Sequence, residues 1–423
     1  MGQYNKWSAL GLACAACFLA LLGCGVTAPP GNTGGTDAWA GACGRGVAVI
    51  SSDYASTNLS FLGLDGAVLS ESVVSSGSAS PGLSAALSGD VVLPTLPGLG
   101  DRLVLIDRAP TNTVLTWVDV KAGAAVAQLP VGTGFASNPH DYVELSDGRA
   151  YVTRYQGNLA AGSEPFDAGN DLLIVDPAVS RITGSIDLTL AIAGAGPQYF
   201  PSPDRAVRVG DQVFVLLGGN TLDFMDSAES RVVVVSDITG EITEVQVLRG
   251  MHGCWGLAVS PSGNQLAVTC PGRFVGSSSV LDESGVVLLS IGDQLRELQR
   301  FPASTFGVGA VGLSVSFATE STLLFVTLGD FGANGQPPMD DTLIRLDLVT
   351  QGFEVLLRSD GEAFTLGDVH CAAACNVCFL ADAKRDGGVV HRFEVSGKGV
   401  LSGGVPIKVD PSIGLPPRYL SRF

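Results

Sequence analysis

A cysteine-rich stretch, HCAAACNVC at residues 370–378, is the part of the sequence whose residue types and spacing could most directly do chemistry. Thiolates spaced as C-x3-C-x2-C can hold an iron–sulfur cluster, and with His370 as a fourth ligand they could hold zinc. In an oxidising compartment the same cysteines would form disulfides instead. The compartment and the fold of the remaining chain therefore decide how this stretch is used.

The N-terminal residues have the composition of an export signal. Lys6 is the only basic residue before an apolar run over residues 9–22, which is too short to span a bilayer comfortably. The run ends in Leu-Leu-Gly-Cys, which resembles the lipobox of bacterial lipoproteins. This resemblance implies a signal peptide over residues 1–23, a lipid-modified Cys24 and a flexible tether rich in Gly, Pro and Thr over residues 24–42. An ordinary signal peptide with a chance cysteine is the alternative.

The lipobox resemblance also implies a location. Gly25 rather than Asp follows Cys24, and by similarity to enterobacterial sorting rules this favours the outer membrane of the cell envelope, on its periplasmic or surface side. The chain is then attached to a membrane through its lipid and is expected to be monomeric.

Composition limits the partners. The chain has 423 residues, 55 of them glycine, only 15% charged residues and a net charge of −17. Beyond residue 22 we find no further apolar segment long enough to span a membrane. Nucleic acid is excluded as a partner, because phosphate binding needs a cationic patch that no segment supplies.

An apolar, β-branched segment recurs seven times between residues 46 and 383, at intervals of roughly 40 to 55 residues. A second apolar segment follows each copy and usually starts with a small or polar residue, as in NDLLIVDP from Asn170 and SRVVVVSD from Ser230. With an inner and an outer strand in most repeats, the pattern predicts an all-β fold over residues 43–423. The predicted fold is a seven-bladed β-propeller of four-stranded antiparallel blades. The seven copies are GVAVISS, RLVLIDR, RAYVTRY, QVFVLLG, QLAVTCP, LLFVTLG and VCFLADA.

The two ends of the repeat region complement each other. The first repeat begins at its second strand, whereas GLPPRYLSRF at residues 414–423 is left over after the seventh repeat. We therefore expect the C-terminal segment to supply the inner strand of the first blade and to close the ring.

Tyr151-Val152-Thr153 resembles the Tyr-Val-Thr-Asn repeat of YVTN-type β-propeller lipoproteins of bacteria. Arg154 replaces the final Asn, so the chain resembles a divergent relative. The resemblance covers the body from about residue 45 onward. It implies the propeller fold but little about function, because that broad group includes surface proteins, lipoproteins and, more distantly, lactonases.

Six cysteines remain once Cys14 and Cys17 leave with the signal and Cys24 takes the lipid. The turn at residues 260–264 predicts a register in which Ser260 faces Asn264, and this register places two cysteines opposite each other. A tight turn pairs two more, and the last two are left for each other. The expected disulfides are Cys254–Cys270, Cys371–Cys378 and Cys43–Cys375.

Other uses of the cysteine-rich stretch fit less well. Its C-x3-C-x2-C spacing resembles the cluster motif of radical SAM enzymes, but those need a reducing cytosol and an α/β barrel. A c-type haem needs Cys-x-x-Cys-His, and Phe379 occupies the histidine position. Zinc is the remaining alternative, and the sequence favours disulfides.

Three histidines lie at or just before expected inner strands, and long acidic loops join second and third strands. In a propeller these features share one face, where a ligand could bind. A protein or glycan ligand is expected there, with Ca²⁺ as a further option because oxygen-rich clusters suit it. The alternative is that the loops are solvated insertions and that the histidines bind local backbone. The ligand-face candidates are His140, Asp167, Asp171, Asp226, His252, Asp330, Asp340, Asp341 and His370.

The sequence thus predicts a lipid-anchored propeller that binds or scaffolds without catalysis, and it assigns no catalytic residue and no metal ligand. The alternative is a periplasmic hydrolase or lactonase-like enzyme with its site at the channel mouth, with His140 or His370 as base and an aspartate as metal ligand. The two hypotheses differ in one observable feature. An enzyme should bring His, Asp or Glu, and Arg together within hydrogen-bond reach there.

Overall fold

A computed structural model describes residues 43–98, 100–275, 278–331, 338–384 and 387–423 of the chain. The expected signal peptide, lipidated Cys24 and tether lie outside the described residues. None of the helices in the described residues has the length and apolar character needed to cross a membrane.

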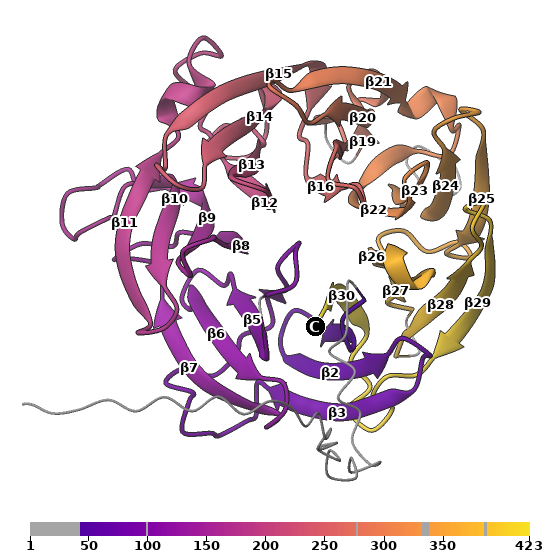
Figure 1. The fold of residues 1–423 in the computed structure, drawn as a ribbon, viewed down its shortest axis with the longest axis horizontal. Helices are drawn as coiled ribbons and strands as arrows, with labels where there is room; N and C mark the ends of the chain where they lie inside the picture. The colour runs from indigo at the N-terminus through magenta and orange to yellow at the C-terminus, as the bar shows by residue number, and fades with distance from the viewer. Residues whose placement is uncertain (1–42, 99, 276–277, 332–337, 385–386) are drawn as a thin grey trace, which may run out of the picture. The chain divides into compact units, whose positions relative to one another are not determined.

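Seven four-stranded antiparallel sheets form a ring, which is the predicted seven-bladed β-propeller (Figure 1). Blade 1 contains β3 (Val68–Ser75), β2 (Thr57–Gly63), β1 (Gly46–Ser52) and β30 (Pro417–Arg422), from the outside inward. The other blades run from an inner to an outer strand in chain order. Blade 2 contains β4 (Val91–Val92), β5 (Arg102–Asp107), β6 (Val114–Asp119) and β7 (Ala124–Pro130), and blade 3 contains β8 (Pro139–Glu144), β9 (Ala150–Gly157), β10 (Gly169–Asp176) and β11 (Arg181–Asp187).

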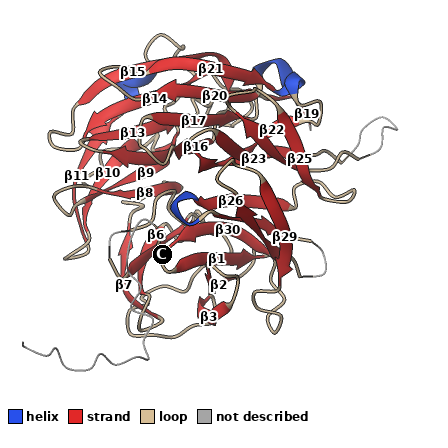
Figure 2. Cartoon of the chain, turned by 45° about the vertical axis from the view of Figure 1, so that its right-hand side comes forward, coloured by secondary structure: helices blue, strands red, loops and turns tan. Residues whose placement is uncertain are grey.

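Blades 4 to 7 follow the same order. Blade 4 contains β12 (Pro203–Val209), β13 (Gln212–Leu217), β14 (Glu229–Ser236) and β15 (Ile242–His252), and blade 5 contains β16 (Gly256–Val259), β17 (Gln265–Cys270), β20 (Gly285–Ser290) and β21 (Arg296–Pro302). Blade 6 contains β22 (Ala310–Thr319), β23 (Thr322–Leu328), β24 (Thr342–Asp347) and β25 (Phe353–Arg358), and blade 7 contains β26 (Leu366–Ala372), β27 (Val377–Asp382), β28 (Val389–Val395) and β29 (Leu401–Ile407). The remaining strands, β18 (Phe274–Val275) and β19 (Ser278–Ser279), form a small hairpin. The described residues also contain four 3-10 turns, drawn as blue helices in Figure 2: η1 (Thr189–Ile192), η2 (Leu281–Glu283), η3 (Ala303–Thr305) and η4 (Ala373–Cys375).

The core lies between neighbouring blades. Every residue of β1 and β2 is buried, whereas the outer strand β11 alternates exposed and half-buried residues. One apolar cluster, for example, joins Phe214 and Val232 of blade 4 to Leu266 and Val287 of blade 5. Each blade therefore buries the flank of the next, and this explains why the two middle strands are the most apolar segments of each repeat.

The C-terminal strand closes the ring as predicted. β30 pairs antiparallel with β1, with Val49 opposite Leu420 and Ala48 opposite Ser421. A disulfide from Cys43 to Cys375 adds a covalent link between the start of blade 1 and the turn η4 of blade 7. The chain ends are thus held both by backbone pairing and by a covalent bond.

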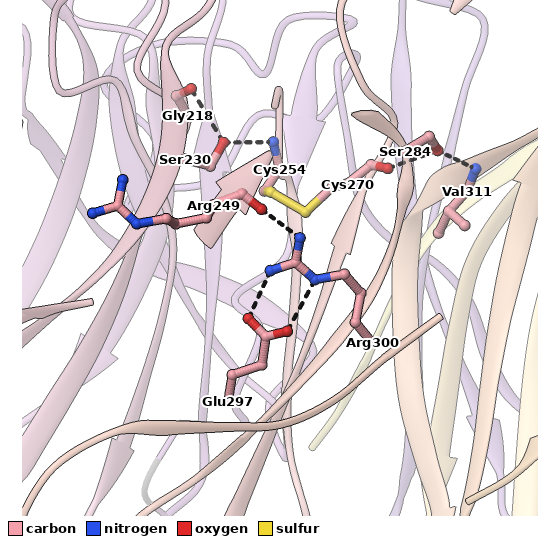
Figure 3. The surroundings of a disulfide bond; sticks show 9 residues. All are labelled: Gly218, Ser230, Arg249, Cys254, Cys270, Ser284, Glu297, Arg300 and Val311. Atoms are coloured by element: carbon pink, nitrogen blue, oxygen red, sulfur yellow. Dashed lines mark hydrogen bonds and ion pairs between the residues drawn. A yellow bond between two sulfur atoms is a disulfide. The ribbon is translucent and has the colours of Figure 1, made fainter. Parts of the chain in front are cut away.

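In blades 4 and 5 the polar residue that leads into the second apolar segment has a structural role. Ser230 accepts a hydrogen bond from the backbone N–H of Cys254 (3.0 Å), and Ser284 accepts one from Val311 (2.9 Å) (Figure 3). Each hydroxyl also donates to a backbone carbonyl, that of Gly218 or of Cys270. These serines fix the start of the next blade, which explains why the repeat carries a polar residue at this point.

All three disulfides join the expected pairs, Cys254 with Cys270, Cys371 with Cys378, and Cys43 with Cys375. Cys371 and Cys378 face each other in the β26–β27 ladder. The register predicted for the other hairpin is wrong by one residue, because the backbone N–H of Ser260 bonds to Gln265 and not to Asn264. Cys254 still reaches Cys270, since it precedes β16 and lies outside the regular ladder.

Candidate functional site

A cavity of about 340 Å³ opens beside the channel mouth, on the face where second strands lead into third strands. Its walls come from blades 2 to 5. Aromatic rings and charged groups both line it, the mixture expected of a site for a small polar ligand. The side chains used below are Arg108, His140, Tyr155, Phe224, Trp255 and Arg273.

The aromatic rings form a stack along one wall. His140 lies flat on Tyr155, with ring centroids 4.3 Å apart and planes 6° apart. Trp255 lies nearly parallel to both, at 5.9 Å from His140 and 6.4 Å from Tyr155. Phe224 also stacks with Tyr155, with ring centroids 5.7 Å apart and planes 25° apart. Asn220 donates to the hydroxyl of Tyr155 at 2.6 Å, which fixes that ring in place.

His140 carries the chemistry of this site. It is buried in β8, and its Nδ1 lies 3.0 Å from Oδ1 of Asp204 in β12. The alignment falls short of a regular hydrogen bond, so the contact is mainly electrostatic. Burial lowers the pKa of His140, and Asp204 only partly opposes this effect. The imidazole is therefore neutral at pH 7, and the nearby carboxylate of Asp204 favours the tautomer that carries its proton on Nδ1 and its lone pair on Nε2.

Two arginines supply positive charge nearby. Nε of Arg205 lies 3.8 Å from the same Oδ1 of Asp204. Burial works against the guanidinium charge, but Asp141, Asp204 and Asp368 together more than compensate, so the pKa of Arg205 is raised. Arg108 contacts Asp90 at 2.6 Å and donates to the hydroxyl of Tyr419 at 3.3 Å. Its charge contributes to the lowered pKa of His140, which places it within electrostatic range of the imidazole.

Two predicted ligand residues are instead buried structural groups. Asp171 forms a double contact with Arg154, at 2.7 Å and 2.6 Å, and both side chains are buried. Asp341 accepts hydrogen bonds from four backbone N–H groups, those of Gly329, Phe364, Thr365 and Leu366. Their carboxylates face protein, and this corrects the expectation that they project toward a ligand.

The remaining acidic candidates are dispersed. Asp167 accepts backbone hydrogen bonds from residues 162–164, which lower its pKa. Asp340 contacts the backbone N–H of Gly361, and Asp330 bridges to Met339 through backbone. Only Asp226 lines the cavity, where it accepts hydrogen bonds from Tyr199 (2.8 Å) and Arg273 (3.1 Å). Within the described residues, no three His, Cys, Asp or Glu side chains form a group that could hold a metal ion.

The other histidines occupy different environments from His140. His252 contacts the carbonyl of Ser227 through Nδ1 at 2.7 Å. His370 lies in the middle of β26 and lines a second cavity of about 270 Å³ inside the channel. The expectation that it shares a site with His140 is therefore wrong. Both ring nitrogens of His391 are occupied, by Asp382 at 2.9 Å and by the carbonyl of Gly404 at 3.3 Å.

Sequence reasoning missed Arg108, Tyr155, Asp204 and Trp255. Tyr155 directly follows the Y-V-T-R segment, and Asp204 lies near the start of an inner strand, as His140 does. The ends of these strands meet at the channel mouth, so polar and aromatic residues at those positions were the available signal.

No family model matches the sequence, and no curated protein sequence matches it. Solved structures share the fold. A candidate 6-phosphogluconolactonase from Bacteroides fragilis superposes with a TM-score of 0.55 at 12% identity, over 89% of this chain and 97% of that one. The periplasmic gluconolactonase of Pseudomonas aeruginosa gives 0.51 at 14% identity, over 89% and 98%. The Cps50 (Swd1) β-propeller domain of Myceliophteria thermophila gives 0.51 at 10% identity, over 80% and 93%. At these identities the likeness establishes the propeller fold alone.

Proposed function

We propose that this protein is a hydrolase that opens a cyclic ester, a lactone of a sugar acid, in the cavity around His140. The contact between His140 and Asp204 next to Arg205 carries the proposal. These contacts bring His, Asp and Arg together beside the cavity, with 3.0 Å between Nδ1 of His140 and Oδ1 of Asp204 and 3.8 Å between that oxygen and Nε of Arg205, and this supports an enzyme over a binding module. Two solved structures of similar fold are named as gluconolactonases or candidate phosphogluconolactonases, which supports this class of reaction.

Each group has a defined task in the proposed reaction. Nε2 of His140 takes a proton from water as the water oxygen attacks the lactone carbonyl carbon, and Asp204 stabilises the resulting imidazolium. Arg108 lines the same cavity and stabilises the negative charge on the carbonyl oxygen. The ring C–O bond then breaks and the imidazolium returns the proton to the leaving oxygen, which becomes a hydroxyl. The other product is a carboxylic acid, which releases its proton to water and becomes a carboxylate.

The aromatic wall supports a sugar-derived substrate. The exposed ring of Phe224 and the half-buried ring of Trp255 offer flat apolar surface on which the C–H face of a sugar ring can lie, and Tyr155 supports both from within the stack. Asn138 and Asp226 line the same cavity and offer partners for hydroxyl groups. A non-catalytic sugar-binding protein would use these same rings, so turnover must be measured directly.

The test is acid release from glucono-1,5-lactone and related aldonolactones, followed with a pH indicator and corrected for spontaneous opening. We expect His140→Gln to reduce kcat/KM at least about 100-fold, whereas His252→Gln should retain wild-type turnover because His252 does not line the cavity. Saturable binding of a lactone without turnover by the wild type would contradict hydrolysis and favour the binding protein.

We also propose that the chain is exported and lipidated at Cys24. The three disulfides support this, since such bonds persist in an oxidising compartment. Radiolabelled palmitate should be incorporated into the wild type and not into Cys24→Ala, and an unlabelled wild type in a host that lipidates a reference lipoprotein would contradict it.

A further inference from the structure

Four exposed aromatic residues on the cavity-bearing face have a left-handed backbone conformation. They are Tyr54 (φ 66°), Phe166 (φ 60°), Phe224 (φ 57°) and Phe364 (φ 59°). Bulky residues rarely adopt positive φ, because Cβ then crowds the backbone. Their side chains remain 59%, 39%, 46% and 41% exposed, so burial of the rings does not offset this cost within the chain.

Buried polar groups hold the backbone of three of these residues in place. The N–H of Phe364 donates to buried Asp341, and the carbonyl of Phe166 accepts from buried Arg154 at 2.6 Å. The N–H of Tyr54 donates to Ser52 at 2.9 Å. Strain that is maintained in this way is typical of functional sites. The carboxylates of Asp171 and Asp341 thus act at this face by positioning loops rather than by binding a ligand.

Two of these rings, Tyr54 and Phe364, and a further exposed ring, Phe331, lie over blades 1, 6 and 7 and are connected through Arg418. The rings of Phe331 and Phe364 lie 5.2 Å apart, and Phe331 is 73% exposed. Arg418 lies 4.8 Å from the centre of the Tyr54 ring and donates to the carbonyl of Phe364 at 3.5 Å. We call Tyr54, Phe331, Phe364 and Arg418 the aromatic patch. It is separate from the cavity, because none of its residues lines it.

The surroundings of the aromatic patch indicate its ligand. Arg418 brings one positive charge into the patch, whereas Asp53 and Asp330 adjoin Tyr54 and Phe331 in sequence and the chain carries a net charge of −17, so the patch has no excess of positive charge. Negative charge repels anionic polymers and anionic lipid surfaces, whereas carboxylates accept hydrogen bonds from sugar hydroxyls. Fixed, exposed rings also lose little conformational freedom when a sugar ring lies on them.

We propose that the aromatic patch binds an uncharged oligosaccharide, with sugar rings lying on Tyr54, Phe331 and Phe364. A protein partner is less well matched, because the patch consists of three rings and one guanidinium, whereas a standard protein interface involves about 20 to 30 residues on each side. The proposal does not depend on hydrolysis in the cavity, since the patch and the cavity use different residues.

The test is retardation of the full chain in native gels that contain neutral glucans, mannans or xylans, followed by calorimetry with a hexasaccharide of the best polymer. We expect the Phe331→Ala/Phe364→Gly double variant and Tyr54→Gly to weaken binding at least 10-fold. Both glycine substitutions should keep or raise the unfolding midpoint, because glycine tolerates positive φ. Val349→Ala is the matched control, since Val349 is 78% exposed in the turn after β24, on the opposite face.

Binding should also persist in 0.5 M salt and should be much weaker for a carboxylated glycan of the same length. Absence of retardation in every neutral polysaccharide, or equal binding by the wild type and the double variant, would overturn the proposal. Capture of anionic vesicles in preference to neutral glycans would overturn it as well. Lactone turnover in the same variants is expected to be unchanged, which separates this result from that on the cavity.

Discussion

Nδ1 of His140 and Oδ1 of Asp204 lie 3.0 Å apart, although the two residues come from the inner strands of neighbouring blades. The contact therefore exists only when blades 3 and 4 are packed together. Thr153 supports the same junction, because its hydroxyl donates to the carbonyl of Asp204 at 2.7 Å and accepts from the N–H of Asp141 at 2.8 Å. The threonine of the Y-V-T segment thus helps to position the two candidate catalytic strands.

Asp204→Asn should reduce kcat for lactone opening by about 100-fold or more and change KM little, because the carboxylate stabilises the imidazolium formed during reaction. Asp204 raises the pKa of His140, so its removal lowers that pKa further. The acid limb of the pH profile of kcat/KM should therefore move to lower pH. Asp147→Asn, in an exposed pair with Arg149, is the control. A variant whose acid limb moves to higher pH would contradict the assignment.

Arg154→Met should destabilise the protein by about 3 to 5 kcal/mol, because it leaves the carboxylate of Asp171 buried without its partner. Arg154→Met/Asp171→Leu should recover part of this loss. The exposed pair of Arg149 and Asp147 offers the comparison, and Arg149→Met should cost at most about 1 kcal/mol. Chemical denaturation measures all three, and equal effects at both arginines would refute a buried structural pair.

Ser284→Ala tests whether the polar residues of the repeat fix the blades. The substitution removes the acceptor of the Val311 N–H and should cost about 1 to 3 kcal/mol. The hydroxyl of Ser290 donates only a long, exposed hydrogen bond, of 3.4 Å, to the carbonyl of Arg296. Ser290→Ala should therefore have little effect on the unfolding midpoint. If the two variants unfold at the same denaturant concentration, the inter-blade role of Ser284 is wrong.

The sequence was sufficient for the fold because the constraint repeats. Each blade needs two buried middle strands, and seven copies of that pattern are visible without knowledge of any contact. The register of the β16–β17 hairpin could not be predicted correctly from the sequence. One extra residue in its turn shifts the pairing by one, and turn length depends on local backbone geometry that composition does not fix.

The candidate site was less predictable than the fold for a different reason. An aspartate in a loop has the same sequence signature whether it faces solvent or satisfies backbone N–H groups, and Asp341 does the latter. Conversely, Trp255 and Tyr155 belong to different blades and meet only through ring closure. His140 was identified because it combines a titratable side chain with the start of an inner strand, whereas its partner Asp204 required the packing of two blades.

His370 should make stability depend on pH. Burial, assisted by Arg422, lowers the pKa of His370 to about 3, whereas the unfolded chain has a value of about 6.5. Between these values the unfolded state binds more protons, so this group's contribution to stability falls as pH decreases, by up to about 1.4 kcal/mol per pH unit. His370→Gln should flatten the dependence of the unfolding free energy on pH between 6 and 4. An unchanged slope would show that His370 titrates normally.

The ring is closed by the pairing of β30 with β1 and by the disulfide between Cys43 and Cys375, and the contribution of each link to stability can be measured separately. Deletion of residues 415–423 removes β30 and exposes the edge of β1, all of whose residues are buried, so we expect loss of cooperative thermal unfolding. Cys43→Ser/Cys375→Ser keeps β30 and removes only the covalent link across 332 residues, which should cost about 2 to 4 kcal/mol. Cys371→Ser/Cys378→Ser removes a link across only 7 residues and should cost less, because a short loop constrains the unfolded chain less. A truncated chain with the wild-type melting midpoint would show that β30 does not close the ring, whatever the disulfide variants do.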